Sequence, residues 1–175
     1  KIVNSNTLNE FSTLRVNIDT LKVPTFDAMK FYTEFISNLI NTYEITSSST
    51  DIISLRNELF STLNLIKAKE SRGQTRATFN ALFTNNLPMN EQNIFTIGGL
   101  LNIYEIKISE FYNSATPQVK EFYDKNFDIS IKKQNDKYID IAKTNFNNGN
   151  YNIAAKDWFN SVSKEIENLK QIEEF

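Results

Sequence analysis

Residues 52–83 read IISLRNELFSTLNLIKAKESRGQTRATFNALF, and this stretch decides the fold. Apolar residues in its first half recur at a/d positions of a heptad, the spacing typical of a packed helix. The positions of this frame are Ile52, Leu55, Leu59, Ile66, Lys69, Gly73, Arg76 and Phe83. We therefore predict one long helix, from about residue 51 to about residue 85, whose seam becomes cationic halfway along.

Three cations gather in the middle of this predicted helix. Lys69, Arg72 and Arg76 have the spacing i, i+3, i+7, which puts them on one side, and Gly73 leaves room for a small ligand to come close. A guanidinium group donates to two oxygens of a planar anion at once. The pattern predicts a small-anion site. The alternative is a solvated face on which Arg72 pairs with Glu70 or with a carboxylate elsewhere.

The composition indicates a single all-α domain, residues 1–175. The chain has only four glycines and three prolines among its 175 residues. It has no cysteine and no histidine, which excludes disulfides, thiolate nucleophiles and histidine-based triads. Because no phosphate loop and no metal-ligand spacing occurs either, we expect no enzyme activity, no metal and no cofactor. The net charge of −2 argues against nucleic acid as a partner.

The periodic stretches predict an up-and-down antiparallel helical bundle that resembles a four-helix bundle, with about six helical segments. Helices are expected at about residues 5–22, 25–45, 51–85 and 131–146. Further segments should start after Asn90 and at Pro117, and the last helix holds Trp158 and Ile172. Thr25 and Asn90 are expected caps, and a turn is expected at residues 145–150.

Short turns make neighbouring helices antiparallel, so positions on either side of Pro88 can be paired by reflection. This places Arg76 level with Gly99, and Arg72 level with Tyr104. Missing side chains beside Arg76 suggest room for a ligand, to which the Tyr104 hydroxyl would donate. The alternative is that Gly99 and its neighbour Gly98 allow two helices to pack closely.

The arrangement Lys69-Glu70-x-x-Gly73-x-x-Arg76-Ala77 resembles the Lys-Glu-x-x-Gly-x-Glu-Arg-Ala signature of the nitrate- and nitrite-sensing domain. That family is an all-helical sensor module of bacterial chemoreceptors, histidine kinases and antiterminators. Thr75 stands where the signature has Glu, and a Glu-Arg-Gly element usual in the family would lie upstream of this chain. The resemblance implies an extracytoplasmic sensor that binds nitrate or nitrite through arginines, here Arg76, Arg72 and Arg15.

Arg15 is a special case among these arginines. At a rise of about 1.5 Å per residue, it would lie roughly 15–20 Å along the bundle from Arg76, too far for one small anion to bridge. Either the helices are staggered, or Arg15 acts across a dimer interface, or it pairs with Asp19 at i+4.

Both ends of the chain look cut from longer helices. We therefore expect an excised periplasmic region of an inner-membrane protein, flanked by transmembrane helices and forming a homodimer. The ligand would be nitrate, nitrite or another small anion. Two alternatives stay open: a helical module that docks a protein partner without a small ligand, and a helical-bundle sensor for an organic acid or amino acid.

Overall fold

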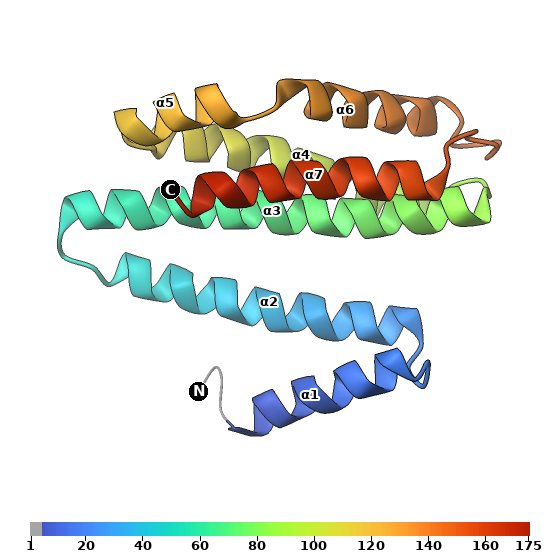
Figure 1. Ribbon diagram of the computed structural model, residues 1–175, viewed down its shortest axis with the longest axis horizontal. Helices are drawn as coiled ribbons and strands as arrows, with labels where there is room; N and C mark the ends of the chain where they lie inside the picture. Colours follow the sequence, from blue (N-terminus) through green and yellow to red (C-terminus); the bar gives the residue numbers. More distant parts are fainter. Residues whose placement is uncertain (1–4) are drawn as a thin grey trace. The chain divides into compact units, whose positions relative to one another are not determined.

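The computed structural model describes residues 5–175, with side chains from Asn9 onward apart from Phe26. This part of the chain holds seven helices and no strand, which confirms the predicted all-α class (Figure 1). The helices are α1 (Ser5–Asp19), α2 (Thr25–Ser48), α3 (Ile53–Asn85), α4 (Glu91–Ser114), α5 (Pro117–Asn126), α6 (Ile129–Thr144) and α7 (Ala155–Glu173).

The chain forms two compact units. The first ends at Ile52 and contains α1 and α2. Its two helices meet through an aromatic cluster, in which the ring of Phe11 lies 5.9 Å from Phe31, 5.2 Å from Tyr32 and 5.0 Å from Phe35, between centroids. Edge-on and tilted pairs of this kind are the preferred geometry of aromatic rings.

The second unit, Ile53–Phe175, is a four-helix bundle with up-down-up-down topology. Helix α3 runs along its whole length and packs against both α4 and α7 (Figure 1). The third arm is divided into α5 and α6, and α7 then returns antiparallel to α6. The predicted bundle architecture is therefore confirmed in this unit.

Side-chain caps explain where three of these helices start. The Asn90 side chain accepts from the backbone N–H of Asn93 over 2.8 Å in a capping box, as predicted for α4. Thr116 caps α5, with Pro117 at its first position. Asp128 accepts from the N–H groups of Ser130 and Ile131 and so restarts the arm at α6. The Ser130 hydroxyl bond and these backbone bonds lower the pKa of Asp128.

The loops that join α3 to α4 and α6 to α7 bind each other. The amide N–H of Met89 donates to the carbonyl oxygen of Phe146, and the Tyr151 hydroxyl donates to that of Leu87. Gly149 has φ +64°, and a Cβ there would stand 2.6 Å from the carbonyl oxygen of Asn86. Only glycine fits this close approach, which holds that end of the bundle together.

The core consists of two hydrophobic clusters. One surrounds Trp158, Phe79 and Phe83, and the other surrounds Leu65, Phe111 and Leu169. On α3 and on α7, one buried charged residue lies between the two sets, namely Arg72 and Glu165. A polar layer thus divides the core at the middle of the bundle.

The heptad frame predicted for α3 is wrong by one position. Residues that occupy the interior a/d frame are Ser61, Leu65, Ala68, Arg72, Thr75, Phe79 and Leu82. Polar residues are accommodated there because each finds a partner: Ser61 donates to the Phe111 carbonyl oxygen and Thr75 to that of Ser71. Lys69, Gly73 and Arg76 therefore flank the seam, and Ile52 is exposed.

Several predicted helix ends also differ. Helix α1 ends at Asp19, three residues early, and α2 continues to Ser48 because Ser47 and Ser48 bond back to the carbonyl oxygen of Glu44. Thr25 is the first residue of α2 and not its cap as predicted; Pro24 takes the cap position and makes no side-chain hydrogen bond.

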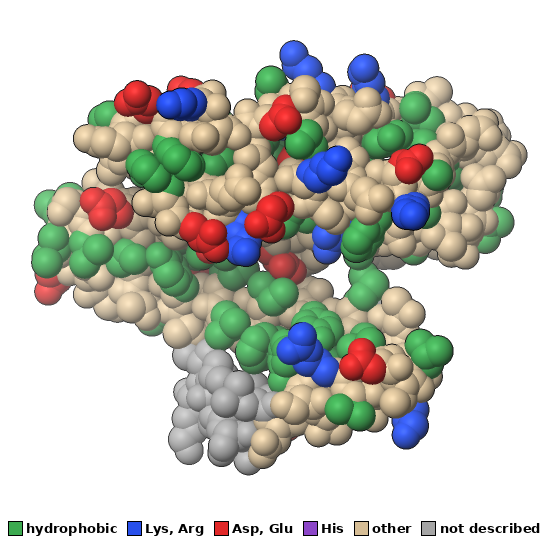
Figure 2. All heavy atoms as spheres, viewed as in Figure 1, with side chains coloured by type: hydrophobic (Ala, Val, Ile, Leu, Met, Phe, Trp, Pro, Cys, Tyr) green, Lys and Arg blue, Asp and Glu red, His purple; other side chains and the backbone are tan. Residues whose placement is uncertain are grey.

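Within the described residues, no helix combines the length and apolarity needed to cross a membrane. On the face in Figure 2, charged side chains of both signs are interspersed with hydrophobic ones.

Candidate functional site

Of the residues predicted to bind a ligand, four lie on the middle of α3, namely Lys69, Arg72, Gly73 and Arg76. Gly99 and Tyr104 lie on α4, and Arg15 lies on α1. The Lys69 ammonium pairs with the Glu173 carboxylate near the end of α7. Arg72 and Arg76 contact α7 at two successive levels, through Glu165 and Ser163. The two arginines have different surroundings and therefore different chemistry.

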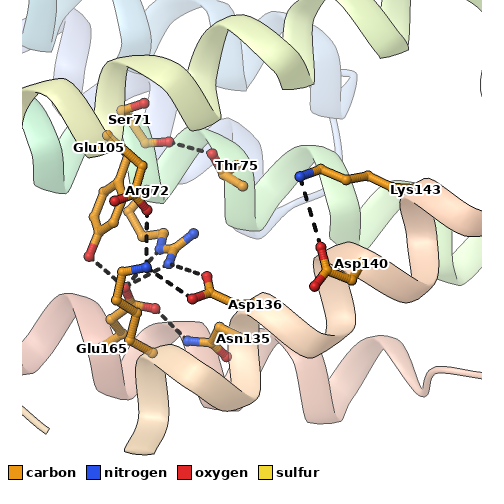
Figure 3. Close-up of polar contacts among 11 residues, drawn as sticks. Ser71, Arg72, Thr75, Glu105, Asn135, Asp136, Asp140, Lys143 and Glu165 are labelled. Carbon is orange, nitrogen blue, oxygen red and sulfur yellow. Dashed lines mark hydrogen bonds and ion pairs between the residues drawn. The ribbon is translucent and has the colours of Figure 1, made fainter. Parts of the chain in front are cut away.

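Arg72 is buried and is bound through two of its three guanidinium nitrogens. Its Nε and Nη2 donate to Glu165 Oε1 over 2.9 and 2.8 Å. The Tyr104 hydroxyl donates to the same oxygen over 2.6 Å, and Asn135 Nδ2 donates to Oε2 over 2.5 Å. Four helices thus meet at one carboxylate, as Figure 3 shows. The predicted neighbours Arg72 and Tyr104 are indeed in contact, with the guanidinium carbon 4.2 Å from the ring centroid.

Three further charged side chains, from α4 and α6, lie next to this layer. Asp136 lies 3.7 Å from Arg72, and the Lys132 ammonium bridges Asp136 and Glu105 at 2.9 and 3.0 Å (Figure 3). Burial acts to lower the pKa of Arg72, but the attraction of Glu165, then of Tyr104 and Asp136, outweighs it and leaves that pKa raised. Burial, followed by the Glu165 charge, raises the pKa of Tyr104 well above its ordinary value.

Arg76 is half-buried and only partly engaged. Its Nη1 donates to the Ser163 hydroxyl oxygen over 2.7 Å, and the guanidinium carbon lies 4.5 Å from the centroid of the Phe159 ring. Its Nε is buried and has no hydrogen-bond partner. Burial lowers the pKa of Arg76. The Nε–H of this guanidinium thus lacks an acceptor although it is shielded from solvent, which is uncommon for a buried polar group.

There is open space on the same side of α3. Gly73 precedes Arg76 by three positions, so the two share a face. Apart from its chain neighbours and the backbone of its own helix, no heavy atom lies within 4 Å of the point where a Cβ of Gly73 would stand. The role of Gly73 as room for a ligand stays a prediction.

The predicted juxtaposition of Gly99 and Arg76 is wrong. Ser71 on α3 donates to the carbonyl oxygen of Leu100 on α4 over 2.6 Å. Because the two helices are antiparallel, Arg76 is then level with a point on α4 about one helical turn before Gly99. The chain reverses at once at Asn86, which has φ 52°, so the centre of reflection lies before Pro88. Gly99 is exposed with open space beside it, and Arg76 points to α7 instead.

The alternative that Arg72 pairs with a carboxylate elsewhere is confirmed, but sequence reasoning identified neither Glu165 nor the contacts of Arg76. Glu165 lies in the repeat Trp158, Val162, Glu165, Leu169, Ile172, so a carboxylate on an apolar seam was the available signal for a buried ion pair. Ser163 and Phe159 lie beside that seam and carried no such signal. Arg15 is exposed on α1, in the first unit, and its role stays a prediction.

The sequence of almost the whole chain matches one known protein family. The family model described as nitrate and nitrite sensing matches residues 2–175. The chain belongs to this family. It is therefore a nitrate- and nitrite-sensing domain, a sensor module of signalling proteins, and the family is one of sensors rather than enzymes. No curated protein and no solved structure matches the chain.

Proposed function

We propose that this nitrate- and nitrite-sensing domain is the periplasmic sensor of a bacterial chemoreceptor or related signal transducer, and that it binds nitrate, nitrite or another small anion at Arg76. The observation that carries the proposal is the unpartnered Nε of Arg76, and Gly73, three residues earlier on the same helix, leaves space on that face of α3. Lys69, about two turns before Arg76 on α3, adds positive charge to this face, although Glu173 partly neutralises it.

The surroundings of Arg76 favour a small, planar, singly charged anion. Ser163 fixes one terminal nitrogen, so the Nε–H edge is the one left for a ligand. Two oxygens of nitrate, nitrite or a carboxylate match the fork of Nε–H and its neighbouring terminal N–H. Phe159 covers one face of the guanidinium, which restricts the ligand to the plane of the fork.

Calorimetric titration with nitrate, nitrite, formate and perchlorate at constant ionic strength tests this proposal. Arg76→Ala should lower planar-anion affinity by roughly 10–150-fold, the equivalent of about 1.5–3 kcal/mol for a hydrogen bond to a charged group. Arg76→Lys should restore little, because lysine lacks the fork. Lys164→Ala is the matched control, since it removes an exposed cation next to Ser163. Equal affinity in wild type and Arg76→Ala would remove Arg76 from the site.

The same titration separates the alternatives. Tighter binding of larger carboxylates or amino acids than of nitrate would support an organic-acid or amino-acid sensor. Absence of binding by every anion would support a protein-docking module. We propose the small anion first because the unpartnered Nε of Arg76 is buried, and a small ion needs less space than a large one to reach it.

We also propose that the domain works as a homodimer between flanking transmembrane helices, with Arg15 contributing across the interface. Ligand and dimerisation would then be coupled reciprocally: an anion that tightens the dimer binds the dimer more tightly by the same factor. Sedimentation velocity over a concentration series, with and without nitrate, measures this coupling. A strict monomer with full anion affinity would leave Arg15 as a structural residue.

A further inference from the structure

The polar layer at the centre of the bundle has the composition of an anion-binding site. Its donors come from three helices, namely Arg72 on α3, Tyr104 on α4 and Asn135 on α6. The group that they bind, the Glu165 carboxylate, comes from the fourth helix, α7. Arg72 and Glu165 are each only 1% exposed. The donor groups thus lie on α3, α4 and α6, whereas the carboxylate that accepts from them lies on α7.

A carboxylate is a planar oxyanion with two equivalent oxygens. The Nε and Nη2 groups of Arg72 both reach one of these oxygens, and the Tyr104 hydroxyl reaches it as well, while Asn135 holds the other. Formate, nitrite and nitrate present two oxygens in much the same way. The same donors would therefore satisfy a free anion of that shape and charge.

Asn135 adds an independent observation. Its amide is fully buried, and its Oδ1 has no hydrogen-bond partner. A buried amide that served only to fill the core would cost stability through this unpaired acceptor. Its orientation is set by the negative charge that Nδ2 faces. The Nδ2 group of Asn135 thus donates to an oxyanion, while its Oδ1 stays without a hydrogen bond.

We infer that this layer, formed by Arg72, Tyr104 and Asn135, is a second planar-oxyanion site that the protein fills with its own Glu165 carboxylate. A tethered carboxylate has a high effective concentration, so it outcompetes free anions as long as α7 stays in place. A free anion that replaced Glu165 would leave the three donors satisfied but release the centre of α7 from α3, α4 and α6.

One edge of the layer is partly exposed to solvent. Lys132 and Asp136 lie on α6 beside Arg72, and their side chains are 18% and 41% exposed. Asp136 is also the only other carboxylate within ion-pair distance of Arg72 among the described residues. When Glu165 is removed, Asp136 is therefore the carboxylate of this protein that could pair with Arg72 and so compete with a free anion.

Two substitutions at Glu165 test this site, and both are made in the Arg76→Ala background so that the proposed sensor site cannot contribute. Glu165→Ala vacates the carboxylate volume, whereas Glu165→Gln keeps it filled with a neutral amide. A third variant adds Asp136→Asn to Glu165→Ala and removes the internal competitor. Each protein is titrated with formate, nitrite and nitrate, with perchlorate as the tetrahedral anion at the same ionic strength. Binding is followed by calorimetry and by the melting temperature.

We expect Glu165→Ala to bind formate and nitrite at least about tenfold more tightly than Glu165→Gln does, since only the former leaves charge-assisted donors free. This binding should disappear when Arg72→Met is added. If Glu165→Ala is unfolded in plain buffer, the same titration should restore its helical circular dichroism. Equal responses to planar and tetrahedral anions, or no response in Glu165→Ala and in Glu165→Ala/Asp136→Asn, would overturn the inference. Neither result would bear on Arg76 in the otherwise unchanged protein.

Discussion

The indole N–H of Trp158 donates to the backbone carbonyl oxygen of Arg76 across 2.9 Å, from α7 to α3. Trp158 is fully buried, and its ring lies 5.1 Å from Phe79 and 5.6 Å from Phe83. The residue at the proposed anion site is therefore fixed through its backbone to the larger hydrophobic cluster. Any shift of α7 against α3 must alter this bond, so the site and the helix packing are mechanically linked.

Trp158→Phe should destabilise the bundle by about 1–3 kcal/mol, through the lost hydrogen bond and the smaller ring. Urea denaturation followed by circular dichroism measures this as a lower midpoint with an unchanged slope. Anion affinity should fall less than in Arg76→Ala, because the guanidinium keeps its contacts with Ser163 and Phe159. A loss of affinity as large as that of Arg76→Ala would show that backbone placement, rather than the charge, dominates binding.

The helical fold could be predicted because local signals decide it. Asn90, Thr116 and Pro117 are cap residues with a direct structural role, and the apolar repeat of α7 matches its buried face apart from Glu165. The frame of α3 was harder, because its interior positions hold Ser61, Arg72 and Thr75 beside the apolar residues. A pattern based on hydrophobicity places such residues outside, and only their partners on other helices show that they lie inside.

The candidate site was predictable only in part for the same reason. The spacing of Lys69, Arg72 and Arg76 predicted one cationic side of α3, but Arg72 lies in the buried interior and only Lys69 and Arg76 flank it. The spacing in the sequence does not reveal that the charge of Arg72 is neutralised by Glu165, which lies 93 positions later in the chain. The choice between a free and a paired arginine depends on long-range contacts, which no local spacing contains.

Arg72 and Glu165 should show strong energetic coupling. Removing one partner from a buried pair leaves an uncompensated charge, so Arg72→Met or Glu165→Leu alone should each cost about 3–5 kcal/mol. The double substitution should cost clearly less than the sum, because no charge then remains without its partner. Chemical denaturation of the four proteins of this cycle measures the coupling energy. Additive costs would show that the pair contributes only through packing.

Tyr104 should make stability sensitive to alkaline pH. Its pKa is raised above the ordinary value of 10.0, by burial first and by the Glu165 charge second. The unfolded chain therefore loses this proton near pH 10 while the folded protein keeps it. Tyr104 contributes fully to stability below about pH 10, and that contribution is lost as the pH rises further, towards the folded-state pKa.

Tyr104→Phe should accordingly be less stable than wild type at pH 8 by about 1.5–3 kcal/mol, the cost of a hydrogen bond to a carboxylate. Its free energy of unfolding should fall less steeply between pH 9.5 and pH 11 than that of wild type, by about one proton of slope. Denaturation curves at a series of pH values provide both numbers. Parallel pH profiles would mean that Tyr104 ionises normally in the folded protein.

Gly73 and Gly99 provide a matched pair for the proposed anion site. Both lie within helices, and a Cβ at either position would meet no heavy atom within 4 Å. Alanine is favoured over glycine in a helix interior by about 0.5–1 kcal/mol, so Gly73→Ala and Gly99→Ala should each raise the melting temperature.

Anion binding should distinguish the two substitutions. Gly73 shares the face of Arg76 on α3, and its open space is the room that the proposed ligand needs, so Gly73→Ala should weaken nitrate binding and Gly73→Leu should abolish it. Gly99 lies on α4, whereas Arg76 turns to Ser163 on α7, so Gly99→Ala should leave affinity unchanged. Thermal melts and calorimetry on the three variants give both quantities. Full nitrate affinity in Gly73→Leu would place the anion on the other side of the Arg76 guanidinium, and a loss in Gly99→Ala would place α4 in the site.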